Sequence, residues 1–287
     1  MSIGGEIRRL EPGLYFVATP IGSARDVTLR ALDLLASADV IAAEDTRTAR
    51  KLMEIHDISL GDRKIVAYHD HNGAAVRPRI LAALEAGKSV VYASEAGTPM
   101  VADPGFVLAR EAIGAGFLVT SAPGPSAVVA ALTIAGLPTD KFLFAGFAPS
   151  TSGARRRFLR ELADIPATLV IYESPKRVHK SLTDIVLELG PERQIALCRE
   201  LTKKFEEVLR GTAQELCDLL LKRKLKGEIV LVVDRNRAVA SAESLEEELE
   251  KALETMTIKD AASAVSQNLG LPRRQAYQAA LKIGKKP

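Results

Sequence analysis

Three segments combine glycine and proline with polar side chains directly after apolar, β-branched runs: "TPIG" (19–22), "SEAGTPMVADPG" (94–105) and "APGPSA" (122–127). Such runs are typical of buried strands, so each segment falls where a predicted strand ends. Glycine lets the backbone come close to a ligand, and proline holds the shape of a turn. Any one segment is readily explained as an ordinary turn. Three at one sheet edge predict a ligand-binding cleft, because ligands of open α/β sheets bind there.

The phosphate-binding signatures of nucleotide sites are absent from these segments. The sequence contains no G-x-x-x-x-G-K-[ST] loop, and Gly114 and Gly116 fall at the end of a predicted helix instead of after a strand. A cofactor with an adenosine and an amino-acid part but no phosphate suits loops of this kind, and S-adenosylmethionine fits that description. By analogy with Rossmann-like sites, Glu44 ends the second predicted strand where a ribose-binding carboxylate is expected.

Groups that could move a proton cluster in "RELTKKFEE" (199–207): Arg199, Glu200, Lys203 and Glu206. Lys203 could act as a general base if desolvation lowers its pKa, or could hold a phosphate. The alternative is a charged strand end paired with itself. We favour a functional role for Lys203 and Arg199, and leave Glu200 open. Glu173 ends another predicted strand, where catalysis and capping of the next helix are equal alternatives.

The elements that must position these groups alternate along the chain. Predicted strands at 14–19, 39–44, 64–72, 88–93 and 116–122 are separated by helical patterns, which predicts a parallel sheet covered on both faces. A Gly-, Pro- and Ser-rich break at 136–153 precedes a second α/β half, and 235–244 is predicted as a linker. We therefore expect an N-terminal α/β domain (1–137), a C-terminal α/β domain (138–236) and a small helical tail (237–287).

The tail has a helix-turn-helix rhythm. Thr257 is the expected N-cap of one helix, with Asp260 in the capping-box position and Gly270 as its end, and Pro272 opens the next. DNA binding is one interpretation. A small packing or docking bundle is the one we favour, because this pattern is easily matched by chance.

Composition limits the class of protein. The chain has 287 residues, 47% of them hydrophobic, and 39 basic against 36 acidic side chains give a net charge of +3. That balance does not establish a nucleic-acid partner. No apolar run is long enough for a membrane helix, no secretory signal is evident, and the spacing of Cys198 and Cys217 suggests neither a disulfide framework nor a zinc site. We expect a cytoplasmic protein.

Several motifs, in order along the chain, resemble one family: "VATPIGSARDVTLRAL", "AEDTRTARKLM", "YHDHN", "SEAGTPMVADPG", "APGPSA", "YESPKRV", "CRELTKKFEE" and "KGEIVLVV". Nearly the whole chain is similar to the ribosomal RNA small subunit methyltransferase I family, within the tetrapyrrole-methylase (class III) superfamily. Glu95 departs from the pattern, since the family usually has Asp there. The resemblance implies two α/β domains with the cofactor cleft between them and a small C-terminal helical domain.

The resemblance also implies an activity: 2′-O-methylation of a cytidine in the decoding region of 16S rRNA, on the small (30S) subunit, by a homodimer using S-adenosylmethionine. No metal is implied, and the pair His69 and His71 lacks an evident third ligand. The predicted cofactor-binding residues are Pro20, Gly22, Ser94, Glu95, Ala96, Gly97, Thr98, Val101, Ser126, Ala127, Tyr172 and Leu201. The predicted catalytic residues are Lys203, Arg199, Glu173 and Glu200.

An RNA substrate gives the basic clusters "ARRRFLR" (154–160) and "SPKRV" (174–178) a role beyond that of solvated helix faces. The predicted RNA contacts are Arg47, His69, His71, Asn72, Arg155, Arg156, Arg157, Lys176 and Arg177. For Arg47 the alternative is a salt bridge to Glu44 or Asp45. Two rival functions remain open: a tetrapyrrole or other small-molecule methylase, and a ligand-sensing DNA-binding regulator.

Overall fold

The computed structural model describes residues 9–69, 71–102 and 104–284. Its strands are β1 (Gly13–Val17), β2 (Val40–Ala43), β3 (Ile65–Ala67), β4 (Ser89–Ala93), β5 (Val119–Ala122), β6 (Phe142–Phe147), β7 (Thr168–Glu173), β8 (Gln194–Arg199), β9 (Glu207–Thr212) and β10 (Ile229–Val233). Its α-helices are α1 (Leu29–Ser37), α2 (Thr46–Ile55), α3 (Gly73–Glu85), α4 (Phe106–Gly114), α5 (Ala127–Ala135), α6 (Ser152–Leu162), α7 (Val178–Leu189), α8 (Ala213–Leu221), α9 (Arg237–Leu253), α10 (Ile258–Leu269) and α11 (Arg273–Ile283). A 3-10 turn, η1 (Ala24–Asp26), precedes α1.

Contacts divide the chain into two compact units. The first contains the chain up to Ile134 together with Cys198–Glu207, and the second contains Ala135–Leu197 together with the chain from Val208. The segment Cys198–Glu207 therefore packs with the first unit, although it lies far along the chain from it.

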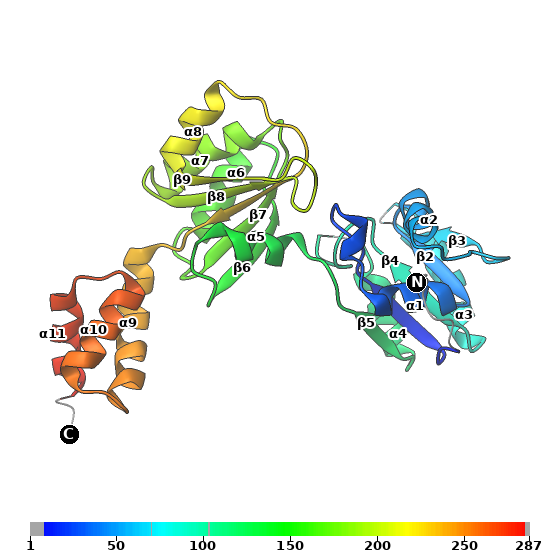
Figure 1. Ribbon diagram of the computed structural model, residues 1–287, viewed down its shortest axis with the longest axis horizontal. Coiled ribbons are helices and arrows are strands. Elements are labelled where there is room, and N and C mark those ends of the chain that lie inside the picture. Colours follow the sequence, from blue (N-terminus) through cyan, green and yellow to red (C-terminus); the bar gives the residue numbers. More distant parts are fainter. Residues whose placement is uncertain (1–8, 70, 103, 285–287) are drawn as a thin grey trace. The chain divides into compact units, whose positions relative to one another are not determined.

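The first unit contains the predicted parallel sheet, in the order β3-β2-β4-β1-β5 (Figure 1). Every pair in it is parallel, and Val17 of β1 lies opposite both Ala93 of β4 and Ala122 of β5. Because parallel strands end at the same edge, this register brings the segments after β1, β4 and β5 together. The prediction of a parallel sheet is confirmed.

Two hydrophobic clusters cover the faces of this sheet, as alternation of side chains along each strand requires. Tyr15 and Val17 pack with buried residues of α1 and α2, whereas Leu14 and Phe16 pack with buried residues of α3 and α4. Burial on both faces explains why these strands are almost uniformly apolar.

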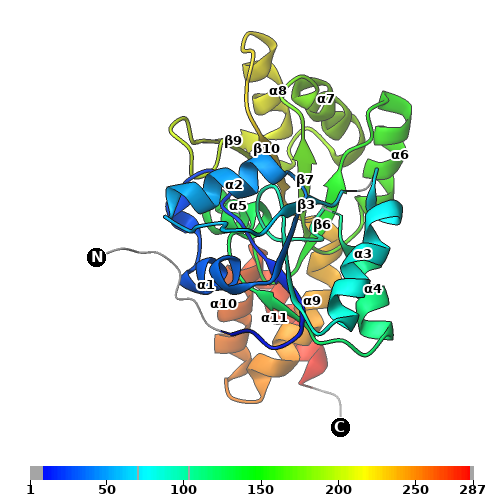
Figure 2. The same ribbon diagram turned by 90° about the vertical axis from the view of Figure 1, so that its right-hand side faces the viewer.

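The second unit contains a mixed sheet in the order β6-β7-β10-β8-β9, in which β7 runs parallel to β6 and antiparallel to β10. Helices α6, α7 and α8 pack side by side against one buried cluster of this sheet (Figures 1 and 2). Two strands were not predicted. Strand β6 lies inside the expected break at 136–153, where its apolar run FLFAGF is flanked by glycine, proline and serine, and β9 (EVLRGT) mixes apolar and polar residues; both are edge strands and only partly buried.

Helices α9, α10 and α11 form a small bundle around their own hydrophobic cluster (Figure 1). The hydroxyl of Thr257 accepts from the backbone N–H of Asp260, and Gly270 ends α10 in the left-handed conformation with φ 66°, as predicted. The expected linker at 235–244 differs from the structure, because α9 begins at Arg237. Among the described residues, no helix is long and apolar enough to cross a membrane.

Candidate active site

The three predicted loops meet at one edge of the first sheet. Thr19 and Gly97 form a two-way backbone bridge, with both N–H to O distances at 2.9 Å. The hydroxyl of Thr98 donates to the carbonyl of Pro125 over 2.9 Å, which ties in the third loop. The loops after β1, β4 and β5 are therefore joined by hydrogen bonds to main-chain atoms, and the predicted convergence is confirmed.

Buried hydroxyls form the floor under this bridge. Ser94 donates to the carbonyl of Gly97 over 2.5 Å, and the Thr19 hydroxyl lies 3.2 Å from the carbonyl of Ser94. Beside them the backbone N–H of Glu95 donates to the Glu44 carboxylate over 3.0 Å. Glu44, predicted to hold a ribose, instead accepts a hydrogen bond from the next loop, so it helps to fix that loop.

Glycine is required at two positions by the way these loops pack. Gly97 has φ +83°, a conformation that side chains disfavour, and a Cβ on it would lie 3.3 Å from Ile21 Cγ2. A Cβ on Gly124 would lie 2.9 Å from the Ala18 Cβ. Both glycines let main chains approach each other, which leaves a smooth, backbone-lined surface. The small predicted cofactor residues Ala96 and Ser126 lie on these same loops, and Ala127 begins α5 directly after the third one.

A fourth segment of the first unit, Cys198–Glu207, packs on the loop after β1. The Ser23 N–H donates to the Thr202 hydroxyl over 3.0 Å. A Cβ on Gly22 would stand 2.5 Å from Lys203 Cγ and 2.9 Å from the Leu201 carbonyl oxygen, so only glycine permits this contact. Leu201 is buried there. The predicted cofactor residues Gly22 and Leu201 are thus brought together.

The charged groups of this segment are paired with one another. Lys203 Nζ lies 2.9 Å from Glu200 Oε1, and Arg199 Nε lies 3.1 Å from Glu207 Oε2. Glu200 and Thr202 adopt left-handed backbone conformations, with φ 52° and φ 63°. Residues without glycine's freedom hold such conformations only where their surroundings impose them, and such positions cluster at functional sites. The structure brings Lys203 and Glu200 together.

Glu173 and Tyr172 belong to the second unit. The buried Glu173 carboxylate accepts from the Ser174 N–H over 2.6 Å and from the Ser181 hydroxyl, and it pairs with Arg177 at 2.8 Å. This geometry gives Glu173 a structural role beside the start of α7, although it does not cap the helix, because it accepts from no backbone N–H of α7. Tyr172 packs edge-on against Phe144 and Phe147.

The basic cluster on α6 differs from the prediction that it binds RNA throughout. Arg155 is 2% exposed and bonded to Asp184, with Nε to Oδ2 at 2.7 Å, so it is a structural residue and not an RNA contact. Arg156 pairs with Glu188, and its hydrogen bond to that side chain holds the pKa of the Glu188 carboxyl below its usual range. Arg157 and Lys176 are exposed. Of the three consecutive arginines, only Arg157 fully faces solvent.

The candidate RNA contacts of the first unit lie around α2 and after β3. Arg47 pairs with Asp45 at 2.7 Å, as the alternative reading proposed, yet its side chain is 90% exposed. His69 and His71 were expected on one face of a strand, but β3 ends at Ala67 and they lie in the following turn, 6.0 Å apart between ring centroids. Asn72 closes this turn by donating to the Ala67 carbonyl over 3.0 Å. No group of three metal-ligating side chains occurs among the residues that the structure describes.

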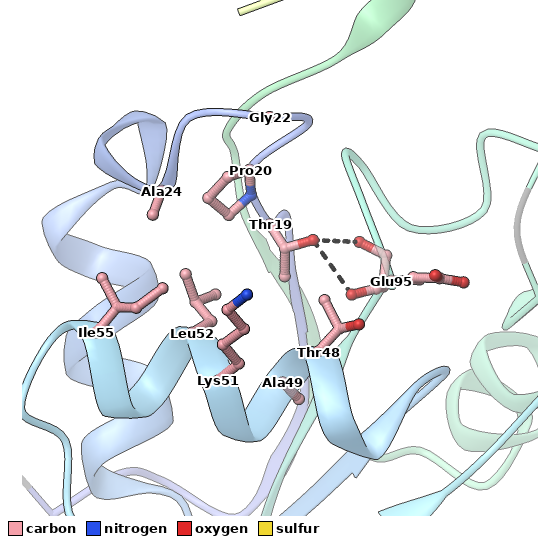
Figure 3. A pocket seen from close by; sticks show the side chains of 11 residues that line it. Thr19, Pro20, Gly22, Ala24, Thr48, Ala49, Lys51, Leu52, Ile55 and Glu95 are labelled. Carbon is pink, nitrogen blue, oxygen red and sulfur yellow. Dashed lines mark hydrogen bonds between the residues drawn. The ribbon is translucent and has the colours of Figure 1, made fainter. Parts of the chain in front are cut away.

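A pocket of about 240 Å³, here called the α2 pocket, opens beside the bridged loops (Figure 3). It is lined by Thr19, Pro20, Gly22, Ala24, Thr48, Ala49, Lys51, Leu52, Ile55, Ser94 and Glu95. Sequence reasoning missed Thr48 and Lys51. The available signal was their helical spacing after "AEDTR", which places both on the side of α2 that faces the loops.

Comparison with known proteins agrees with this geometry. Residues 13–217 match the family model of Tetrapyrrole (Corrin/Porphyrin) Methylases, and residues 238–284 match that of the RsmI C-terminal HTH domain. The chain belongs to the tetrapyrrole methylase family. It is accordingly a methyltransferase, and S-adenosylmethionine is its methyl donor.

Curated relatives match nearly the whole chain. The ribosomal RNA small subunit methyltransferase I of Mesorhizobium japonicum is 46% identical, covering 96% of this chain and 94% of its own length. The protein of the same name from Halalkalibacterium halodurans is 40% identical, over 92% of this chain and 93% of that protein. A solved uroporphyrin-III C-methyltransferase of Thermus thermophilus, complexed with S-adenosylhomocysteine, shares the fold with a TM-score of 0.53 at 21% identity, over 77% of this chain and 97% of that one.

Proposed function

We propose that this protein transfers a methyl group from S-adenosylmethionine to the 2′-hydroxyl of a cytidine in the decoding region of 16S rRNA, on the small ribosomal subunit in the cytoplasm. The observation that carries the proposal is the joining of four segments, around Thr19, Gly97, Pro125 and Thr202, at one edge of the first sheet. The names of the curated relatives support small-subunit rRNA as the substrate. The homodimer stays a prediction.

The residues present fit the cofactor. Gly97, Ala96 and Ser126 offer main-chain groups and small side chains, which suits a ligand held largely through the backbone. When bound, S-adenosylmethionine supplies an electrophilic methyl group. The chain must then place the ribose hydroxyl in line with that methyl and provide for its proton.

The Lys203–Glu200 pair is our candidate for this second task. It presents a donor and an acceptor 2.9 Å apart on a segment held by Thr202. The ammonium can hold the hydroxyl or its neighbouring phosphate, while a carboxylate oxygen receives the proton. Positioning supplies most of the rate in such a site, and a general base adds about 10²–10⁴-fold.

The test is transfer of labelled methyl to small ribosomal subunits from cells that lack this enzyme. Naked 16S rRNA and a tetrapyrrole precursor serve as parallel acceptors. Label on a single cytidine ribose of the subunit RNA is the expected result. Label on the tetrapyrrole alone would show that the substrate is wrong and the fold right. Binding of cofactor without transfer to any acceptor would favour the ligand-sensing regulator.

A further inference from the structure

The residues that line the α2 pocket suit the binding of a nucleoside. Pro20, Leu52 and Ile55 give it an apolar side, and Ile55 is 52% exposed although it lines a hollow. Thr48 and Lys51 add a hydroxyl and an ammonium, and Figure 3 shows Lys51 extending from α2 toward the loop that carries Pro20. A flat ring with polar substituents fits such a surface, because extruded bases pack between apolar side chains and form hydrogen bonds at their edges.

Lys51 is the side chain in this pocket that is suited to bind an anion. Within the described parts of the chain its ammonium forms no hydrogen bond or ion pair. Arg47 precedes it by one helical turn with its side chain 90% exposed, but it is paired with Asp45, so Lys51 is the cation that this side of α2 offers to the pocket. A lysine ammonium is a compact charge suited to a phosphate, and phosphate contacts dominate RNA affinity.

The size and place of the pocket distinguish target from cofactor. Its volume of about 240 Å³ falls below the roughly 300–1,000 Å³ of ordinary ligand pockets, which suits one nucleoside better than a cofactor with adenosine and methionine parts. The Thr19 and Ser94 hydroxyls on its floor are hydrogen-bonded to each other, which leaves them few hydrogen bonds to give to a polar ligand. It nevertheless shares Pro20, Gly22, Ser94 and Glu95 with the predicted cofactor-binding residues, so whatever fills it lies directly beside the cofactor loops.

We propose that the α2 pocket receives the target nucleotide after it is extruded from the RNA strand, with the base against Leu52 and Ile55 and a phosphate on Lys51. Enzymes that act on one nucleotide commonly take it out of the stack into a pocket of this kind. The inference rests on the proposed function and adds the place where the substrate is held. It also gives Lys51 and Thr48 roles in substrate binding.

The experiment measures binding without turnover. A fluorescently labelled single-stranded RNA with the decoding-region sequence is titrated, in the presence of S-adenosylhomocysteine, by wild type, Lys51→Met and the matched control Arg50→Met. Arg50 is exposed on the same helix but does not line the pocket. Lys51→Met is expected to raise the RNA Kd about tenfold and to reduce the slope of log Kd against log salt by about 0.7, the value for one phosphate contact to a single strand. Arg50→Met should change the RNA Kd less than threefold.

A second pair of variants tests the apolar wall. Ile55→Ser should weaken RNA binding about fivefold, whereas Ile113→Ser, at another exposed isoleucine, on α4 and outside the pocket, should not. S-adenosylmethionine titrations by calorimetry should give the same Kd for wild type and all four variants. A raised cofactor Kd in Lys51→Met would mean that the pocket holds the cofactor and would overturn the inference.

The outcomes separate the inference from the function beneath it. If wild type labels RNA but Lys51→Met binds RNA as Arg50→Met does, the pocket assignment is wrong and the proposed function stands. If wild type labels no RNA in the methyl-transfer assay, the proposed function itself fails, and the nucleotide assignment falls with it.

Discussion

The loop that follows β4 and the segment that joins β8 to β9 carry most of the predicted site, and they are held in place differently. The first is fixed largely through main-chain groups: the Thr19–Gly97 bridge, and carbonyls that accept from the Ser94 and Thr98 hydroxyls. The second is fixed by side chains: the Thr202 hydroxyl accepts from the Ser23 N–H, and the Glu206 carboxylate accepts from the Thr202 N–H over 2.6 Å. Substitution of a glycine should therefore disturb the first loop most, whereas the second should respond to single polar substitutions.

Gly97→Val should have the largest effect on the backbone-held loop. At φ +83° any side chain is strained, and the Cβ would press on Ile21, so the Thr19–Gly97 bridge cannot keep its geometry. We expect cofactor binding to be lost, with the Kd rising at least 100-fold by calorimetry. The chain should remain folded, since left-handed strain costs about 1–2 kcal/mol.

Gly87→Val is the matched control for that prediction. Gly87 has φ +72° and open space around its Cβ position, so it imposes similar strain outside the loops. It should lose comparable stability and keep its cofactor Kd. Equal cofactor affinity in both variants would show that Gly97 does not shape the site.

Gly22→Ala should have the next largest effect, because it lies where the two kinds of loop touch. The added Cβ would collide with Lys203 Cγ and with the Leu201 carbonyl, so the side-chain-held segment must shift. Methyl transfer at saturating cofactor should fall about 10²-fold. Gly114→Ala, with open space at its Cβ position, should stay at the wild-type rate. A fall of similar size in both variants would argue for a general loss of folding.

Thr202→Ala isolates the side-chain anchor. It removes the acceptor of the Ser23 N–H, whose hydrogen bond contributes about 1 kcal/mol or less at this exposed position. The rate of methyl transfer should fall about fivefold. Thr202→Ser keeps the hydroxyl and removes the branched carbon from a residue at φ 63°, so it should restore the rate. A serine variant as slow as alanine would show that the hydroxyl is not the anchor.

The same contrast explains how far the sequence predicts this molecule. The first sheet and its three loops were predictable from local signals: β1 and β4 are continuous apolar runs, and the segments after β1, β4 and β5 are rich in glycine and proline. The start and end of α10 in the tail were also predictable from local signals, the N-cap residue Thr257 and the terminal Gly270. Strand β6 was missed because its apolar run FLFAGF lies in a stretch rich in glycine, proline and serine, and β9 was missed because it mixes apolar and polar residues.

The sequence does not show which partner each charged residue has in the folded protein. Arg155 and Arg157 are near neighbours of the same type, yet one is buried on Asp184, 29 residues further along the chain, and the other is exposed. The packing of Thr202 on Ser23 spans 179 residues. Lys51 was missed because helical spacing shows which side of α2 it lies on, but not that a pocket lies beside that side. Contacts of this kind depend on tertiary structure and leave no local pattern.

The smallest predicted effect concerns the helix that lines the α2 pocket, which neither loop controls. Asp45 caps α2 by accepting from the Arg47 and Thr48 N–H groups at 2.7 and 3.3 Å, and the Arg47 side chain holds the pKa of its carboxyl well below the usual range. Because the folded-state pKa is the lower one, this stabilisation is complete above the unfolded value, about 3.9, and is lost as pH falls through the folded value. Asp45→Ala should cost about 1 kcal/mol at pH 7, whereas Asp45→Asn keeps the cap, should cost less, and should remove this acid-dependent part. Urea unfolding at pH 7, 5 and 3 measures both, and cofactor affinity should be unchanged in each. A loss of cofactor binding in Asp45→Asn would show that the α2 cap, and not the loops alone, sets the shape of the site.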